Sequence, residues 1–218
     1  VLNEQLGLVK ENNYTVAFNG STIYENVSKK KLVNHLLKGE YGGEVLDILR
    51  RYPVNVLAYE NEKLWCDKPT DRIKRYAGNS FIPYYVTEDL RELVSHDFSK
   101  IIAISDNEKL SQIQQACNSC GITDKVGVFF SGEDILEFNP YNIDKGTGVK
   151  DLLEKINIDP SEAIAIGDNF NDIPMIENVG MGVAVKNGVD EIKSVANYVT
   201  ENDNNHNAVA EVIYKFIM

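Results

Sequence analysis

Short apolar segments divide the first part of the chain into alternating predicted strands and helices. Residues 14–18 predict a strand and residues 21–24 predict the strand that returns, because Asn19-Gly20 between them is a hairpin turn signal. Apolar positions on one side predict the tail of a helix over residues 1–11, and two further helices are expected over residues 28–37 and 44–51.

Paired strands dominate the middle of the chain, and regular alternation of helix and strand dominates its end. The middle predicts strands over residues 54–59, 63–66, 100–105, 126–130 and 135–138, and helical segments over 71–76, 88–94 and 108–120. After Pro140 we expect helices over 147–156, 173–179, 189–196 and 208–217, and strands over 163–166, 182–185 and 198–200. Such alternation predicts a parallel sheet, so we expect an α/β protein with a separate α+β insert.

Composition excludes several classes of protein. With 218 residues, 43% of them hydrophobic, the chain can form one or two domains with a sizeable core. The net charge is −11 and no block of Lys and Arg stands out, which argues against nucleic acid or an anionic membrane as the partner. No stretch approaches the ~18–20 apolar residues of a membrane span, and no secretory signal is present. The three cysteines do not make a disulfide framework, so we expect a cytoplasmic protein.

The C-x-x-C spacing of residues 117–120 is typical of redox and zinc motifs, but its context favours structural cysteines. The motif is predicted to close a helix with Gly121 as the C-cap, where the negative end of the helix dipole disfavours a thiolate. A zinc site would need a second pair of cysteines, and only Cys66 remains.

The segment G-D-N-F-N-D at residues 167–172 follows directly on the apolar run of residues 163–166. Ligands of open α/β sheets bind at the carboxyl ends of strands. Asp168 and Asp172, four residues apart on a turn that enters a helix, can converge on one hard cation such as Mg²⁺. A capped loop without a ligand is the alternative, since Asn and Asp favour turns and N-caps. Two carboxylates and two amides directly after a strand favour the functional interpretation.

Lys145 begins the segment K-G-T-G just ahead of a predicted helix N-terminus. A cation next to exposed N–H groups makes an anion site, although a surface lysine before a capped helix is the simpler alternative. One helix separates Lys145 from the acidic turn, and in a parallel sheet that connection returns the chain to the same edge. A lysine, two carboxylates and Mg²⁺ then predict a phosphoryl site. Neither K-G-T-G nor the G-M-G-V-A-V of residues 180–185 meets the requirements of a P-loop or dinucleotide fingerprint.

These motifs resemble those of the haloacid dehalogenase superfamily, specifically its Cof-type phosphatases. K-G-T-G resembles the third family motif, and G-D-x-x-N-D followed by I-P-M resembles the fourth. Residues 182–188 and 196–200 resemble the end of a Cof sequence, and F-N-G at residues 18–20 resembles the turn before the cap. The resemblance begins at about Asn13 and continues to the end of the chain.

The resemblance implies a Rossmann-like core with a parallel sheet and an inserted α/β cap. The core would comprise residues 1–22 and 139–218, and the cap would comprise residues 23–138 and close over the site to exclude water. It implies a Mg²⁺-dependent phosphatase of small phosphorylated metabolites, such as sugar phosphates, which acts through an aspartyl-phosphate.

Particular residues acquire roles through the resemblance. Asp168 would bind Mg²⁺, and Asp172 would bind it through water or orient Lys145, whose charge offsets that of the phosphate. The remaining expected contacts with the substrate come from Asn171, Asn19 and Gly20.

Two family motifs are not found in this sequence. The nucleophile belongs to a D-x-D-G-T motif and the second motif is a Ser or Thr after the next strand, but no D-x-D occurs upstream of Asn19. Loss of a central strand would leave buried backbone groups unpaired at ~1–3 kcal/mol each, against ~5–15 kcal/mol for the stability of a domain. We therefore expect these residues to be part of a longer polypeptide. A folded monomer whose N-terminal residue is Val1 would contradict this expectation.

Two alternatives to a phosphatase stay open at this point. The chain can be a catalytically inactive fragment or pseudoenzyme that acts as a binding or regulatory module. It can also belong to a phosphosugar mutase, an activity of some relatives with similar caps. Transfer of isotope between phosphosugars rather than to water would favour the mutase.

Overall fold

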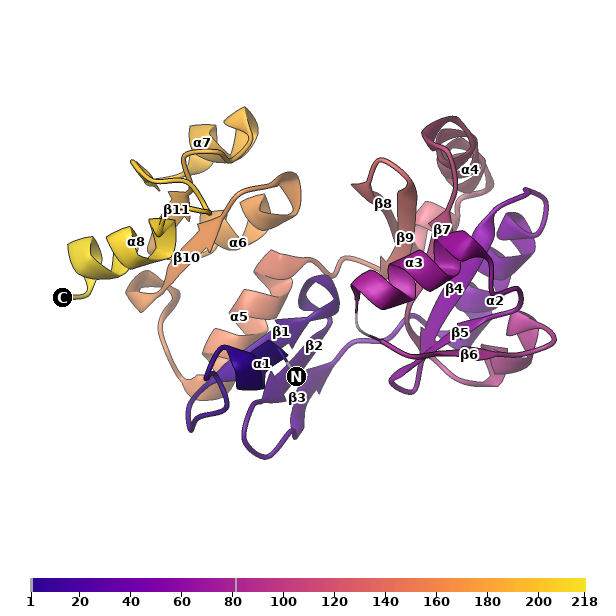
Figure 1. Ribbon diagram of the computed structural model, residues 1–218, viewed down its shortest axis with the longest axis horizontal. Helices are drawn as coiled ribbons and strands as arrows, with labels where there is room; N and C mark the ends of the chain where they lie inside the picture. The colour runs from indigo at the N-terminus through magenta and orange to yellow at the C-terminus, as the bar shows by residue number, and fades with distance from the viewer. Residues whose placement is uncertain (1, 81) are drawn as a thin grey trace. The chain divides into compact units, whose positions relative to one another are not determined.

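The computed structural model describes residues 2–80 and 82–218, and it divides into two compact units (Figure 1). The first unit contains the chain up to Asn34 together with Ile143–Met218, and the second contains His35–Asn142. These boundaries correct the expected ones, because residues 23–34 belong to the first unit and residues 139–142 to the second. Among the described residues, every helix is too short or too polar to span a bilayer.

The first unit opens with a short helix and a three-stranded antiparallel sheet. Helix α1 covers Leu2–Gln5, shorter than the helix expected over residues 1–11, of which Val1 lies outside the described residues. The sheet has the order β1-β2-β3, and its strands are β1 (Tyr14–Ala17), β2 (Thr22–Glu25) and β3 (Lys31–Asn34). The expected hairpin is confirmed, since β1 and β2 pair across the turn η1 (Phe18–Gly20).

The helix expected over residues 28–37 is wrong, because β3 occupies that segment. Ile23 pairs with Val33 in the sheet, and the Thr22 hydroxyl donates to Asn34 Oδ1 at 3.1 Å. Pairing with a neighbouring strand decides the conformation of such short segments more strongly than local propensity does.

A parallel sheet forms the rest of the first unit, as the alternating pattern predicts. Its order is β10-β11-β12, with strands β10 (Ile164–Gly167), β11 (Met181–Ala184) and β12 (Tyr198–Val199). The helices are α5 (Lys145–Ile156), α6 (Ile173–Glu177), α7 (Asp190–Val195) and α8 (Ala208–Phe216), and single 3₁₀ turns are η4 (Pro160–Glu162) and η5 (Phe170–Asp172). Ile176, Ala184 and Ile192 pack together between α6, α7 and the sheet.

The second unit is built on a six-stranded sheet of order β6-β5-β4-β7-β9-β8. Its strands are β4 (Asn55–Glu60), β5 (Lys63–Cys66), β6 (Tyr84–Val86), β7 (Phe98–Ile104), β8 (Val126–Gly132) and β9 (Ile135–Pro140). Its helices are α2 (Gly39–Leu49), α3 (Asp71–Asn79) and α4 (Asn107–Cys120), with 3₁₀ segments η2 (Leu90–Ser95) and η3 (Ile122–Asp124). The paired strands confirm the α+β character expected for the middle of the chain.

Helix α2 begins at Gly39, five residues before the expected start at residue 44. The glycines in its first turns made this part of the helix hard to predict from the sequence. Packing requires them, since a Cβ on Gly42 would lie 2.5 Å from the Phe98 ring. Strand β6 was not expected at all, because it has only three residues and pairs with β5 at the edge of the sheet.

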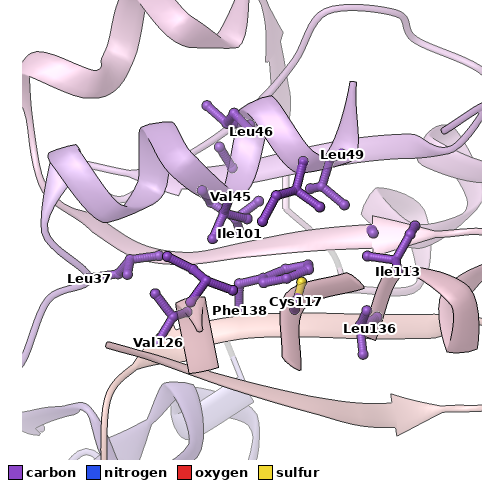
Figure 2. Packing of buried hydrophobic residues seen from close by; sticks show 14 of the residues in the cluster. Leu37, Val45, Leu46, Leu49, Ile101, Ile113, Cys117, Val126, Leu136 and Phe138 are labelled. Carbon is purple, nitrogen blue, oxygen red and sulfur yellow. The ribbon is translucent and has the colours of Figure 1, made fainter. Parts of the chain in front are cut away.

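The core of the second unit lies between α2, α4 and one face of the sheet (Figure 2). Val45 and Leu49 of α2 and Ile113 and Cys117 of α4 meet Phe138 of β9 in this core. Burial raises the pKa of Cys117 to about 12, which removes the thiolate that redox or zinc chemistry needs. This agrees with the structural role expected for Cys117, whereas Cys120 is exposed at the end of α4.

Candidate functional site

The acidic turn after β10 is organised around the side chain of Asp172. One of its oxygens, Oδ2, accepts hydrogen bonds from the backbone N–H groups of Asp168 at 3.0 Å and Asn169 at 3.1 Å. Gly167 makes room for this arrangement, because a Cβ there would lie 2.4 Å from the Cβ of Asp172. The turn therefore closes over a buried carboxylate, and the Asp168 side chain stays exposed.

Lys145 reaches the same carboxylate from the N-terminus of α5. Its Nζ contacts Asp172 Oδ1, and the helix is capped by Asp144, whose side chain accepts from the Thr147 N–H at 2.7 Å. The side chain of Asp172 is 6% exposed and that of Lys145 is 31% exposed. Burial acts to raise the pKa of Asp172, but hydrogen bonds from Lys145 and from the amides of Asp168 and Asn169 outweigh it and hold this pKa below its usual range. The Asp172 carboxylate is therefore ionised at neutral pH.

The turn at the end of β1 lies against the start of α5. Phe18, Asn19 and Gly20 have φ values of +51°, +52° and +101°, a left-handed run that is unusual for side chains other than Gly and Asn. Contact with the helix leaves no space for a side chain at Gly20, because a Cβ there would lie 1.9 Å from the carbonyl oxygen of Asp144. A Cβ on Gly148 would lie 2.5 Å from the Cα of Gly20. The two glycines thus bring Asn19 next to the helix that carries Lys145.

The expected site residues gather around one cavity of about 470 Å³ in the first unit. Its polar lining includes Asn19, Lys145, Asp168 and Asp172, together with the backbone of Gly20, while its apolar lining comes from Val16, Val149, Ile166, Met175, Val185 and Val209. Asn171 does not line the cavity, but its Nδ2 donates to Asn19 Oδ1 at 3.4 Å. The structure thus brings together the residues that the sequence analysis selected.

Asn204 also lines the cavity and was missed by sequence reasoning. It is held by Asn187, whose Oδ1 accepts from the Asn204 N–H at 3.0 Å and whose Nδ2 donates to Asn204 Oδ1 at 3.1 Å. The asparagine-rich run around residue 204 signals a loop, but no spacing in the sequence connects that loop to the acidic turn.

The donor groups in this cavity fit Mg²⁺ bound by few protein ligands. Across residues 2–80 and 82–218, no group of three or more His, Cys, Asp or Glu side chains is placed to hold a metal ion. Mg²⁺ usually keeps several waters and binds through one or two carboxylates together with substrate phosphate. Asp168 offers an exposed carboxylate at the cavity wall, whereas both oxygens of Asp172 contact other groups. These contacts favour the role of orienting Lys145, and direct or water-mediated metal binding by Asp172 stays a prediction.

A parallel sheet whose edge strand β10 ends in an acidic turn, with a lysine from the preceding helix in contact with a carboxylate of that turn, is the architecture of an α/β enzyme. Comparison with known proteins agrees. The chain matches the haloacid dehalogenase-like hydrolase family over residues 2–213 and belongs to that family. The resemblance inferred from the motifs is therefore confirmed.

Three relatives illustrate the extent of the similarity. The crystal structure of TM0651 from Thermotoga maritima is 30% identical, with a TM-score of 0.86 over 100% of this chain and 80% of that one. A haloacid dehalogenase-like hydrolase from Bacteroides thetaiotaomicron is 28% identical, with a TM-score of 0.88 over 98% of this chain and 80% of that one. A Streptococcus pyogenes protein named as a phosphatase is 29% identical over 221 aligned positions, which cover 99% of this chain and 80% of the relative.

Proposed function

We propose that this chain carries the phosphate- and metal-binding residues of a Mg²⁺-dependent phosphatase of small phosphorylated metabolites. The observation that carries the proposal is the ammonium group of Lys145, held by the buried carboxylate of Asp172 beside the exposed carboxylate of Asp168. A fixed cation next to a metal-binding carboxylate is the arrangement that phosphoryl transfer requires. The phosphatase name of the Streptococcus relative supports the same activity.

The residues of this chain bind and orient the phosphate. Lys145 Nζ offsets the negative charge that accumulates on the phosphoryl oxygens, and Asp172 fixes the direction from which that charge acts. Asp168 would hold Mg²⁺, which when bound supplies a Lewis acid for a phosphoryl oxygen. Asn171 and Asn19, joined by their side chains, offer amide donors to the phosphate, and Gly20 lets the backbone approach it.

We further propose that the nucleophilic Asp belongs to a segment outside these 218 residues. Strands β1 and β10 belong to different sheets, yet Val16 of β1 and Ile166 of β10 both contribute to the apolar part of the same cavity's lining. A strand that enters this cavity would bury its apolar residues there and deliver a carboxylate next to Asp168 and Lys145.

Phosphate release from p-nitrophenyl phosphate and a panel of sugar phosphates, with and without Mg²⁺, tests the proposal. The assay compares this chain with the same chain preceded by a strand that ends in D-x-D-G-T. We expect turnover only with the added segment and only with Mg²⁺. Mg²⁺-dependent turnover by the 218 residues alone would place the nucleophile elsewhere, and inactivity of both forms would favour the pseudoenzyme. Isotope transfer between phosphosugars would favour the mutase.

A matched pair of variants tests the role of Lys145 within the active form. Lys145→Met removes the cation that contacts Asp172, whereas Lys150→Met removes an exposed cation from the same helix. We expect the first to lower kcat/KM at least a hundredfold and the second to leave it unchanged. Equal effects would mean that general charge, and not the placement of Lys145, supports turnover.

A further inference from the structure

Asn204 belongs to the loop between β12 and α8 and lines the cavity of the first unit. Its backbone N–H donates to Asn187 Oδ1 at 3.0 Å, and its side-chain Oδ1 accepts from Asn187 Nδ2 at 3.1 Å. We call this reciprocal pair of hydrogen bonds the amide clamp. Two bonds between the same two residues fix the direction of the Asn204 side chain.

The orientation of both amides follows from the chemistry of donors and acceptors. A backbone N–H can only donate, so the side chain of Asn187 must present its oxygen to the Asn204 N–H. The NH₂ group of Asn187 then faces the side chain of Asn204, which must in turn present its own oxygen. The amide clamp therefore leaves Asn204 Nδ2 over, and in the part of the chain that the structure describes no group accepts a hydrogen bond from it.

The amide clamp is tied to the acidic turn after β10. Asn187 lies in the segment that follows β11, and two residues later the Val189 N–H donates to the Asp168 carbonyl oxygen at 3.0 Å. Asn204 is thus held, through Asn187, by the turn that carries Asp168. Its Nδ2 group keeps a fixed place relative to the carboxylate that is proposed to bind Mg²⁺.

Glu211 of α8 holds the same loop from its other side. Its Oε1 accepts from the Glu201 N–H at 2.9 Å, and its Oε2 accepts from the Asn202 N–H at 3.0 Å and from Asn202 Nδ2 at 2.8 Å. A donor that is fixed before the ligand arrives needs no reorganisation when it stabilises charge. The loop therefore presents Asn204 Nδ2 as a preorganised donor.

The chemistry of the cavity defines the group that fits this donor. An NH₂ group needs an acceptor, so it fits neither Mg²⁺ nor the hydrogen atoms of waters bound to the ion. Within the lining, the Asp172 carboxylate is already in contact with Lys145. Asp168 would hold Mg²⁺ together with substrate phosphate, so a phosphate oxygen is the charged acceptor expected in this cavity. A hydrogen bond to a charged acceptor is also stronger than one to a neutral group.

We propose that Asn204 Nδ2 donates a hydrogen bond to a phosphoryl oxygen of the substrate and that Asn187 positions it. The identity of the anion rests on the proposed function. The contact itself requires neither the nucleophile nor turnover, so it can be measured as binding of inorganic phosphate.

Titration with inorganic phosphate in the presence of Mg²⁺ tests this contact. It is carried out on this chain and on the extended form, which is the same chain preceded by a strand that ends in D-x-D-G-T. We expect a saturable shift of the Asn204 side-chain amide resonances in ¹⁵N-correlated NMR spectra. Asn204→Asp keeps the oxygen that accepts from Asn187 and replaces the donor by a second oxygen. It should raise the Kd for phosphate about tenfold, as expected for the loss of a hydrogen bond to a charged group.

The matched control is Asn205→Asp, which adds the same charge at the next residue of the loop, an exposed residue that does not line the cavity. It should change the Kd by less than about twofold, because solvent and salt screen exposed charges. Equal effects of the two Asp variants would assign the loss to general charge repulsion and overturn the proposal. A lower Tm with an unchanged Kd in Asn204→Asp, the result of a purely structural role, would overturn it as well. So would the lack of a saturable shift in both forms at millimolar phosphate.

A double-mutant cycle tests the positioning role of Asn187. Asn187→Ala removes the amide clamp without touching the phosphate, and it should raise the Kd in the wild-type background but not in an Asn204→Ala background. Additive effects of the two Ala variants would mean that Asn187 does not act through Asn204.

Two comparisons separate the possible acceptors and the two proposals. A saturable shift with acetate and none with phosphate would mean that Asn204 receives a carboxylate side chain, and would overturn the contact with phosphate. Hydrolysis of p-nitrophenyl phosphate by the extended form, together with an unchanged phosphate Kd in Asn204→Asp, would refute the contact and leave the phosphatase standing. Phosphate binding that depends on Asn204, without turnover of any phosphate ester, would refute the phosphatase and leave the contact standing.

Discussion

Replacement of Asp172 by Asn tests whether one carboxylate organises the candidate site. Asp172 uses both oxygens, Oδ1 for Lys145 and Oδ2 for the backbone N–H groups of Asp168 and Asn169. Asn keeps the shape of the side chain but has only one acceptor oxygen. Either rotamer therefore leaves donors unpaired, on Lys145 in one case and on the two amides in the other.

The expected loss of stability follows from these contacts. Hydrogen bonds to charged groups contribute about 1.5–3 kcal/mol, and a buried unpaired donor costs about 1–3 kcal/mol. Because the Asp172 side chain is 6% exposed, solvent offers little compensation. We expect Asp172→Asn to lower the free energy of unfolding by about 2–4 kcal/mol, which for a chain of this size corresponds to a fall in Tm of roughly 5–15 °C.

Thermal and urea unfolding followed by circular dichroism measure this loss. The control is Asp190→Asn, since the Asp190 side chain is fully exposed and its pair with Lys193 contributes little. The pKa of Asp172 is lowered in the folded state, so its stabilisation is present above the unfolded pKa of about 3.9 and is lost as pH falls through the lower folded pKa. The difference between wild type and variant should therefore shrink below about pH 4. Equal stability of wild type and Asp172→Asn at pH 7 would refute this account of the site.

Three further predictions follow from the geometry. Gly148→Ala should lower the free energy of unfolding in urea by about 1–3 kcal/mol, because its Cβ would lie 2.5 Å from the Cα of Gly20. The control Gly78→Ala in α3, whose Cβ would have nothing within 4 Å, should raise that free energy by up to about 1 kcal/mol. Shifts of the same sign in the two variants would contradict the close contact. Asp168→Asn should weaken Mg²⁺ binding to this chain at least tenfold in isothermal titration without change in the circular dichroism spectrum, and unchanged affinity would remove Asp168 from the metal site. Hydrogen bonds lower the pKa of Glu211 to about 2. The contribution of Glu211 to the stability of the fold is therefore present above about pH 4.3 and should be lost as pH falls to about 2. A Tm difference between wild type and Glu211→Gln that persists below pH 2 would contradict this.

Sequence reasoning located the acidic turn and its lysine because both depend on local order. An apolar strand followed by carboxylates is visible in the sequence, and one helix, α5, separates Lys145 from that strand. The expected crossover within one parallel sheet is not what joins them, because the strand before Lys145, β9, belongs to the sheet of the second unit. The structure confirms that Lys145 reaches Asp172. The sequence did not show that both Asp172 oxygens would be used in doing so, because those contacts depend on the three-dimensional path of the turn.

Elements that depend on distant partners were harder to predict. Strand β3 was expected to be a helix, since its pairing with β2 is invisible in a local pattern. The first turns of α2 were missed because Gly42, which local propensity disfavours, is needed where the helix approaches Phe98. The buried ion pair of Lys100 with Glu137 has no sequence signature, because the two residues become neighbours only through the pairing of β7 with β9.

The backbone contact between Gly20 and Gly148 limits how this protein can diversify during evolution. Neither position can acquire a side chain without moving the helix that carries Lys145, so a substitution there also disturbs the contact between Lys145 and Asp172. The sheet of the second unit is not tied in this way, and its polar positions can change one at a time without disturbing that contact. Related proteins should therefore keep the glycine pair more often than they keep the polar residues of that sheet.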